Sequence, residues 1–97
     1  MTILFLSPAK QDLRNGFRFY EINEVGLGSY FLESIYADID SLRIFAGIHE
    51  LCFKKYYRAL SKRFPYAIYY TISDKIIEIH AVIDCRRNPE WIKRKLK

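Results

Sequence analysis

His80 is the residue of this sequence whose surroundings best suit proton-transfer chemistry. It lies two residues after Glu78 and four before Asp84, within a run of alternating apolar residues. A histidine side chain can gain or lose a proton near neutral pH, and the carboxylates could assist it. A lone histidine beside acidic residues on an exposed strand is, however, more often a surface pair. His49 lies in an expected loop with nothing to pair it.

Basic residues form two clusters in the second half of the chain. The first cluster is Lys54, Lys55, Arg58, Lys62 and Arg63, and the second, around Trp91, is Arg86, Arg87, Lys93, Arg94, Lys95 and Lys97. Residues 1–50 hold 4 Lys and Arg against 7 Asp and Glu, whereas residues 51–97 hold 12 against 4, so the net +5 conceals halves of −3 and +8. The net charge of +8 on residues 51–97 would attract an acidic partner, either a nucleic acid or an acidic peptide. A solvated basic surface with Trp91 packed on the core explains the same pattern.

The length and composition predict one folded domain spanning residues 1–97. The chain is 51% hydrophobic and 28% charged, as in ordinary folded proteins. Cys52 and Cys85 are too few for a disulfide scaffold and lack zinc-site spacing, so we expect no metal and no cofactor. No stretch approaches the roughly 20 apolar residues of a membrane span. We therefore expect a cytoplasmic protein with no membrane partner.

A β-hairpin is expected to position most of these side chains. Apolar residues occupy every second position from Phe64 to Ile72, and Ser73-Asp74-Lys75 has turn chemistry. The return strand, Ile76 to Ile83, alternates as well. It is expected to place Ile77, Ile79, Ala81 and Ile83 on one face and Glu78, His80, Val82 and Asp84 on the other. One face would be core and the other wet or functional.

The first half predicts a strand followed by two helices. Thr2 to Leu6 fits a strand buried on both faces or at the sheet centre, and Ser7 and Pro8 fit an N-cap and a first helical residue. The first helix would run to about Asn23 and bury Ala9, Leu13, Phe17 and Tyr20, with Lys10, Arg14 and Arg18 towards water. After a turn at Gly26 and Gly28, a second helix capped by Ser29 would bury Phe31, Ile35, Ile39 and Leu42.

The remaining elements complete an α+β fold. Arg43 to Glu50 is expected to form a loop, followed by one strand around Tyr56 to Leu60 and a closing helix from Pro89 to Lys95. The predicted order is β-α-α-β-β-β-α. A mostly antiparallel β-sheet with the N-terminal α-helical hairpin packed on one face buries the apolar sides of both helices.

Two short motifs carry a resemblance to a known family. Arg63-Phe64-Pro65-Tyr66 and Arg86-Arg87-Asn88-Pro89, together with the Gly-Leu-Gly helical turn, resemble the ParE branch of the RelE/ParE toxin superfamily, and the resemblance runs from Leu4 to Lys95. These are small bacterial toxins of type II toxin-antitoxin systems, with a β-sheet and an N-terminal α-hairpin. The resemblance implies a cognate antitoxin whose disordered C-terminal half folds over the toxin. It implies no cofactor.

The family contains two activities. RelE-like members are ribosome-dependent ribonucleases that cut messenger RNA, and ParE-like members are poisons of DNA gyrase. Tyr66 stands where nuclease members carry a catalytic Arg, and Ile83-Asp84-Cys85 stands where some carry a catalytic His or Tyr. The resemblance therefore favours a toxin that acts on gyrase by binding, without catalytic residues.

Two alternatives stay open. One is a messenger ribonuclease acting on the ribosome, which would use His80, Arg58, Arg63 and Arg86. The other is a binding module of the same fold that has lost toxicity. The residues expected to bind the target or a partner are Arg58, Lys62, Arg63, Tyr66, Arg86, Arg87, Trp91 and Arg94. Leu32 and Tyr36 are expected to contact the antitoxin.

Overall fold

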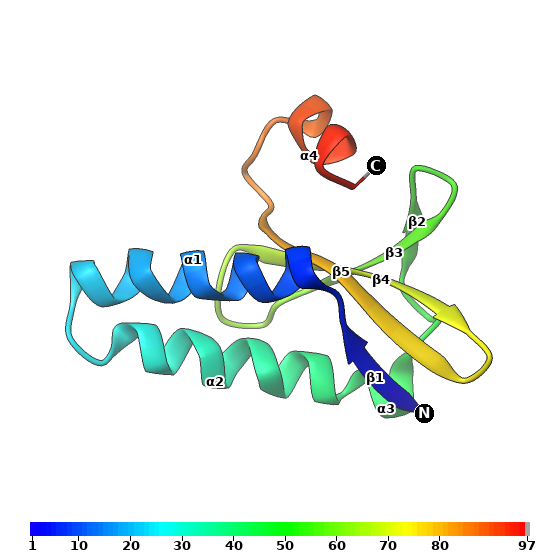
Figure 1. Cartoon of the computed structure of the whole chain (residues 1–97), viewed down its shortest axis with the longest axis horizontal. Coiled ribbons are helices and arrows are strands. Elements are labelled where there is room, and N and C mark those ends of the chain that lie inside the picture. The colour runs from blue at the N-terminus through cyan, green and yellow to red at the C-terminus, as the bar shows by residue number, and fades with distance from the viewer. Residues whose placement is uncertain (97) are drawn as a thin grey trace.

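The computed structural model describes residues 1–96 and contains five strands and four helices. In chain order they are β1 (Thr2–Phe5), α1 (Ser7–Asn23), α2 (Leu27–Asp40), α3 (Leu42–Phe45), β2 (Glu50–Cys52), β3 (Tyr56–Leu60), β4 (Tyr66–Ser73), β5 (Ile76–Asp84) and α4 (Pro89–Leu96). Figure 1 shows α1 and α2 lying side by side as a helical hairpin that extends beyond the sheet. In the described part of the chain no helix is long and apolar enough to cross a membrane.

The strands form one sheet in the order β1-β5-β4-β3-β2. Only β1 and β5 pair in parallel, and the other three pairs are antiparallel. Asp74 and Lys75 form the β4–β5 turn with positive φ angles of 49° and 65°, as expected for a tight hairpin turn. The predicted fold class is therefore confirmed, including the hairpin of strands and the hairpin of helices.

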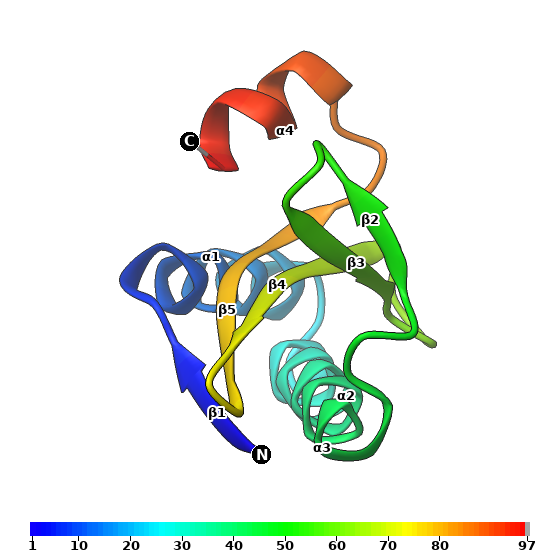
Figure 2. The ribbon, with the colours of Figure 1, turned by 90° about the vertical axis from the view of Figure 1, so that its right-hand side faces the viewer.

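The larger core lies between the sheet and the helical hairpin. Figure 2 shows the helical hairpin on one side of the sheet and α4 on the other. The core comprises Ala9, Leu13, Phe31, Ile35, Ile39, Leu42, Ala59, Ile68, Tyr70, Ile77, Ile79 and Val82. The predicted apolar stripe of the second helix is buried in full. Its spacing of three and four residues keeps these side chains on one helical face.

A second, smaller core lies between the sheet and α4. It comprises Tyr56, Ala67, Tyr69, Ala81, Ile83, Ile92 and Leu96. The hydroxyl of Tyr56 donates a hydrogen bond of 2.6 Å to the carbonyl of Leu96 and holds the end of α4 on the sheet. The expectation that one face of the hairpin is core and the other wet is therefore wrong, because α4 covers part of the second face.

A β-bulge at His80 explains why the predicted faces of β5 are also wrong. Tyr69 pairs with Ala81, but Tyr70 pairs with Ile79, so His80 is an extra residue without a partner on β4. A bulge of this kind interrupts the alternation of faces. Ile77 and Ile79 consequently face the helical hairpin, whereas Ala81 and Ile83 face α4 and Val82 joins the larger core.

The position predicted for strand β1 is wrong. It lies at the edge of the sheet, its four residues alternate between exposed and half-buried, and it is neither central nor buried on both faces. Its run of apolar residues fits a buried strand, but only Ile3 and Phe5 pack against the larger core, whereas Leu4 is exposed.

The helix starts differ from the prediction by one residue for α1 and by three residues for α2. Leu6 rather than Ser7 is the N-cap of α1, and Gly26 rather than Ser29 is the N-cap of α2. Gly26 takes a φ of 91°, which glycine adopts without steric cost.

Two elements were not predicted. The expected loop contains the short helix α3, and the expected single strand is a second hairpin in which β2 pairs with β3. Phe53 and Lys54 form its turn with positive φ angles, which are uncommon for these residue types, so the sequence carried no glycine or asparagine signal there.

Candidate functional site

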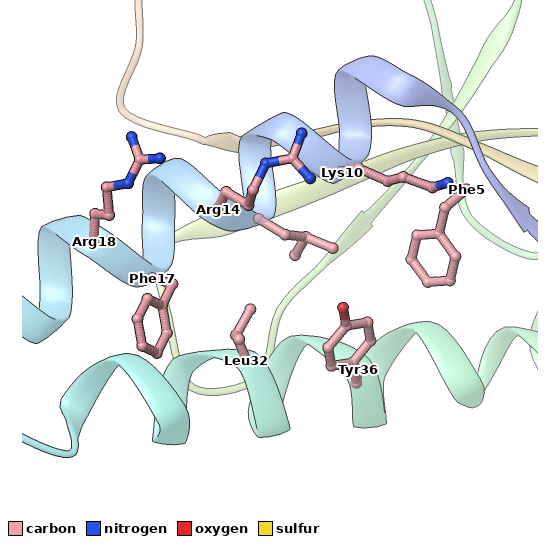
Figure 3. Close-up of a pocket in the computed structure, with 8 residues that line it drawn as sticks. Phe5, Lys10, Arg14, Phe17, Arg18, Leu32 and Tyr36 are labelled. Atoms are coloured by element: carbon pink, nitrogen blue, oxygen red, sulfur yellow. The ribbon is translucent and has the colours of Figure 1, made fainter.

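A groove lies between α1 and α2. It encloses about 530 Å³, and its lining residues are Phe5, Lys10, Leu13, Arg14, Phe17, Arg18, Leu32 and Tyr36. Figure 3 shows Leu32 and Tyr36 rising from α2 towards α1, with Phe17 beside them. Apolar and aromatic side chains form its floor, as in sites that bind an apolar surface of a partner.

The upper wall of the groove carries three cations in a row. Lys10, Arg14 and Arg18 follow one another at four-residue intervals along α1, as Figure 3 shows, and all three are exposed. Side chains at this spacing lie on the same helical face. No Asp or Glu is among the residues that line this groove. The groove therefore combines an apolar floor with a positively charged wall.

Two glycines set the separation of the helices that form the groove. A Cβ on Gly28 would come within 2.7 Å of the carbonyl oxygen of Phe17, and a Cβ on Gly16 would come within 2.5 Å of the ring of Phe31. Both glycines are buried. The helices can approach this closely only because neither position has a side chain.

A carboxylate fixes the turn that joins the two helices. Glu21 accepts hydrogen bonds from the backbone N–H groups of Gly26, at 3.1 Å, and of Gly28, at 3.0 Å. These N–H groups lie at the start of α2, where no preceding turn of helix supplies an acceptor. The side chain therefore replaces the missing helical acceptors and holds the ends of the hairpin together.

A second hollow lies at the end of β5, between α1 and α4. It encloses about 540 Å³, and Tyr66, Asp84, Arg87 and Trp91 are among the residues that line it. The guanidinium of Arg87 lies over the ring of Trp91 at 4.4 Å, within the range of a cation–π contact. Four of the residues expected to bind a target lie at this end of the sheet. Tyr66, Arg87 and Trp91 line the hollow, and Arg86 is paired with Asp84, which also lines it.

Arg86 is held in place by an ion pair. Its Nη2 lies 2.6 Å from Oδ2 of Asp84, and its Nε lies 2.9 Å from Oδ1. Hydrogen bonds from Arg86 hold the pKa of Asp84 below its ordinary value. Burial raises the pKa of Tyr66 to about 12, so the phenol stays protonated at neutral pH.

Comparison of the sequence with protein-family models and with curated proteins finds no match. Among solved structures, a similar chain belongs to the "Chromosomal ParDE TA system from P. aeruginosa". The two chains superpose with a TM-score of 0.80 at 15% sequence identity, over 87% of this chain and 95% of the other. This chain has a RelE/ParE-like fold.

On this RelE/ParE-like sheet, His80 and Arg58 lie on the side covered by α4. Nε2 of His80 is 2.9 Å from the hydroxyl of Thr71, and the imidazole ring packs edge-on against Tyr56. Burial lowers the pKa of His80 below its ordinary value. Nε of Arg58 lies 3.3 Å from the hydroxyl of Tyr69, which faces α4.

Arg63 lies near the helical hairpin instead. Its guanidinium is 5.9 Å from the ring of Tyr30 on α2, whereas Arg86 is bound to Asp84 at the end of β5. Of the four residues named for a ribonuclease, His80 and Arg58 lie on the α4 side of the sheet, Arg63 lies beside α2, and Arg86 lies at the end of β5.

The loop between β3 and β4 carries Lys62 and Arg63, and both are exposed. Oδ2 of Asp38 on α2 accepts hydrogen bonds from the hydroxyl of Ser61, at 2.7 Å, and from the backbone N–H of Lys62, at 3.3 Å. Asp38 therefore positions this loop. Arg94 is exposed on α4, apart from the loop.

Leu32 and Tyr36, the two residues expected to contact an antitoxin, both line the groove between α1 and α2. The sequence interpretation did not assign the row of Lys10, Arg14 and Arg18 to a site. Their four-residue spacing was visible, but it also fits a solvated helical face. Only the position of α2 beside that face identifies them as one wall of a groove.

Proposed function

We propose that this chain is the toxin of a bacterial type II toxin-antitoxin pair, of the ParE-like kind, and that it acts in the cytoplasm by binding its target. The observation that carries the proposal is the RelE/ParE-like fold, which matches a chain of a ParDE toxin-antitoxin system over 87% of this chain. The motifs around Arg63 and Arg86 favour the same branch.

The proposed target is DNA gyrase. The target-binding surface would be the end of the sheet where Tyr66, Arg86, Arg87 and Trp91 gather, extended by Lys62, Arg63 and Arg94. Arginine is suited to such a surface because its planar guanidinium binds carboxylates and phosphates with two hydrogen bonds. Arg63 lies beside α2, whereas His80 and Arg58 lie on the α4 side of the sheet, and this separation supports binding over ribonuclease chemistry.

The test is inhibition of DNA supercoiling by purified gyrase. Micromolar toxin should inhibit the reaction or trap a cleaved DNA complex, and Arg87→Ala should weaken this effect about tenfold. Lys75→Ala is the matched control, because Lys75 is an exposed cation in the turn at the opposite end of the β4–β5 hairpin. Intact gyrase activity at micromolar toxin, or cleavage of ribosome-bound mRNA, would refute this target.

The proposed partner is a cognate antitoxin that covers the groove at Leu32 and Tyr36. Expression of the chain alone should arrest growth, and co-expression of the antitoxin should restore it. Leu32→Glu places a carboxylate on the apolar floor and should prevent the rescue while the toxin stays folded, because Leu32 is only partly buried. Growth without arrest in the absence of an antitoxin would contradict the proposal.

A further inference from the structure

Strand β2 forms an open edge of the sheet. It is the last strand in the order β1-β5-β4-β3-β2, and within residues 1–96 no further strand pairs with its outer side. Figure 1 shows the β2–β3 hairpin projecting from the body of the molecule. An open edge presents backbone N–H and C=O groups that can pair with a strand of another chain. Strand β2 therefore offers a site for a strand of a second chain.

The backbone of Leu51 faces this open edge. The C=O of the next residue, Cys52, points inward, because it accepts a hydrogen bond from the N–H of Lys55 across the β2–β3 turn at 3.2 Å. Successive residues of an antiparallel strand direct their backbone groups to opposite edges. The N–H and C=O of Leu51 consequently point outward, where an incoming strand can bond to them.

Large apolar side chains lie along this edge in contact with water. Leu51 is 53% exposed, Phe53 in the turn is 41% exposed, and Ile48 just before the strand is 73% exposed. Contiguous exposed apolar groups mark surfaces that bind another protein, because covering them removes apolar area from water. The edge therefore offers both free backbone groups and an apolar surface to a partner.

A second copy of the chain fits this edge in one antiparallel register. A two-fold axis beside Cys52 places Leu51 opposite Phe53 of the second copy, so that apolar side chains meet twice. The same axis places Glu50 opposite Lys54 of the second copy, so that opposite charges also meet twice. Neither Glu50 nor Lys54 takes part in an ion pair within residues 1–96. The edge is therefore complementary to itself in both apolar contacts and charge.

We propose that two copies of the chain associate through their β2 edges, antiparallel to each other and with Cys52 of one copy opposite Cys52 of the other. The sheet then continues from one copy into the next. Strand β2 has only three residues, so the interface is small and the dissociation constant is on the order of 10 µM. Leu51 and Phe53 line neither the groove between α1 and α2 nor the hollow at the end of β5, so this inference is independent of the proposed function.

Sedimentation velocity of the full chain tests the association. The native chain should be mostly monomeric at about 1 µM and mostly dimeric at about 200 µM. Leu51→Lys removes an apolar contact from both halves of the interface and should weaken the association about tenfold or more. Leu4→Lys changes an exposed leucine of the opposite edge strand, β1, and should leave the association unchanged. A native chain that stays monomeric at the higher concentration would overturn the proposal and leave this edge to a strand of another protein.

An exchange of charges tests the register. Glu50→Lys and Lys54→Glu each place like charges opposite each other across the two-fold axis, and each should weaken the association about threefold or more. The double variant Glu50→Lys/Lys54→Glu restores the opposite pairs and should recover the native affinity. Both positions are exposed, and circular dichroism checks that each variant is folded. A double variant no tighter than the two single variants would exclude this register.

Oxidative cross-linking of Cys52 reports the contact directly. Opposite residues of a non-hydrogen-bonded antiparallel pair have Cα atoms about 4.5 Å apart, a separation that a disulfide can bridge. Copper phenanthroline, which takes one electron and one proton from each thiol, should therefore link the two copies by an S–S bond at Cys52. Cys85 is partly buried to the same degree and serves as the control, so Cys85→Ser should keep the covalent dimer and Cys52→Ser should abolish it. A covalent dimer that persists in Cys52→Ser would overturn the assigned contact.

Discussion

Lys95 on α4 forms an ion pair with Asp12 on α1, with Nζ 2.8 Å from Oδ1. The other oxygen of the same carboxylate accepts the backbone N–H of Val82 on β5 at 2.9 Å. The side chain of Asp12 is 9% exposed, and that of Lys95 is 21% exposed. Burial raises the pKa of Asp12, and the contacts with Lys95 and Val82 oppose that rise. One carboxylate thus joins three elements that are distant in the sequence.

The first prediction concerns this ion pair. Lys95→Met leaves the carboxylate of Asp12 buried without its cation, so the free energy of unfolding should fall by about 1–3 kcal/mol, and the amides of α4 should exchange faster. Lys93→Met removes an exposed cation of the same helix and should change stability by no more than about 0.5 kcal/mol. Urea unfolding and hydrogen exchange measure both effects, and equal stability of the two variants would contradict the assignment.

The second prediction concerns pH. Burial lowers the pKa of both His49 and His80 below the ordinary value of 6.5. The unfolded chain therefore takes up protons near pH 6.5 that the folded chain takes up only at lower pH. This contribution to stability is complete above pH 6.5 and is lost as the pH falls through the lowered values. The free energy of unfolding should be smaller at pH 5 than at pH 7.5.

Single substitutions assign that pH dependence. The imidazole of His49 contacts the hydroxyl of Tyr70, which also accepts the N–H of Gly47 at 2.9 Å. His49→Gln should reduce the loss of stability between pH 7.5 and 5, and His80→Gln should reduce it separately. An unchanged pH profile in the double variant would show that other groups cause it.

The third prediction concerns the approach of the two helices. Gly28→Ala places a methyl group 2.7 Å from the carbonyl oxygen of Phe17, so the helices must move apart. The free energy of unfolding should fall by about 1–3 kcal/mol, and partner binding in the groove should weaken as well. Ser29→Ala, at the next and exposed position, is the control and should be nearly neutral. Thermal unfolding and the rescue of growth by the antitoxin distinguish the two variants.

The fourth prediction concerns the loop that carries Lys62 and Arg63. Asp38→Ala removes the acceptor of Ser61 and of the Lys62 backbone, so it should cost about 1 kcal/mol and weaken gyrase inhibition. Asp40→Ala removes an exposed carboxylate of the same helix, paired with Arg43, and should leave inhibition intact. Full inhibition by the Asp38→Ala variant would show that this loop is not part of the surface that binds the target.

Much of the fold followed from local patterns in the sequence. The stripe of Phe31, Ile35, Ile39 and Leu42 and the alternation from Phe64 to Ile72 have one periodicity each, so the buried face of both was predicted correctly. The bounds differ, because Leu42 belongs to α3 and β4 begins at Tyr66. The extra residue at His80 could not be predicted, because apolar residues on both faces of β5 make a shifted alternation look regular.

The candidate site was less accessible from the sequence, since its residues come from separate elements. The acidic half of the chain suggested no cationic surface, yet Lys10, Arg14 and Arg18 form one because Asp12 points away from them towards Lys95. The net charge of a segment sums Asp12 with the three cations, whereas the helix places Asp12 on a different face from Lys10, Arg14 and Arg18.

The pairing of β1 with β5 has a consequence for synthesis in the cell. Thr2 pairs with Ile76 and Phe5 with Ile79, so the first strand can pair fully only after the chain has been synthesised as far as Ile79. Contacts between such distant residues form slowly, because a long loop must close before they gain anything. A chain synthesised only as far as β4 therefore leaves β1 without its partner and lacks a strand on which α4 packs.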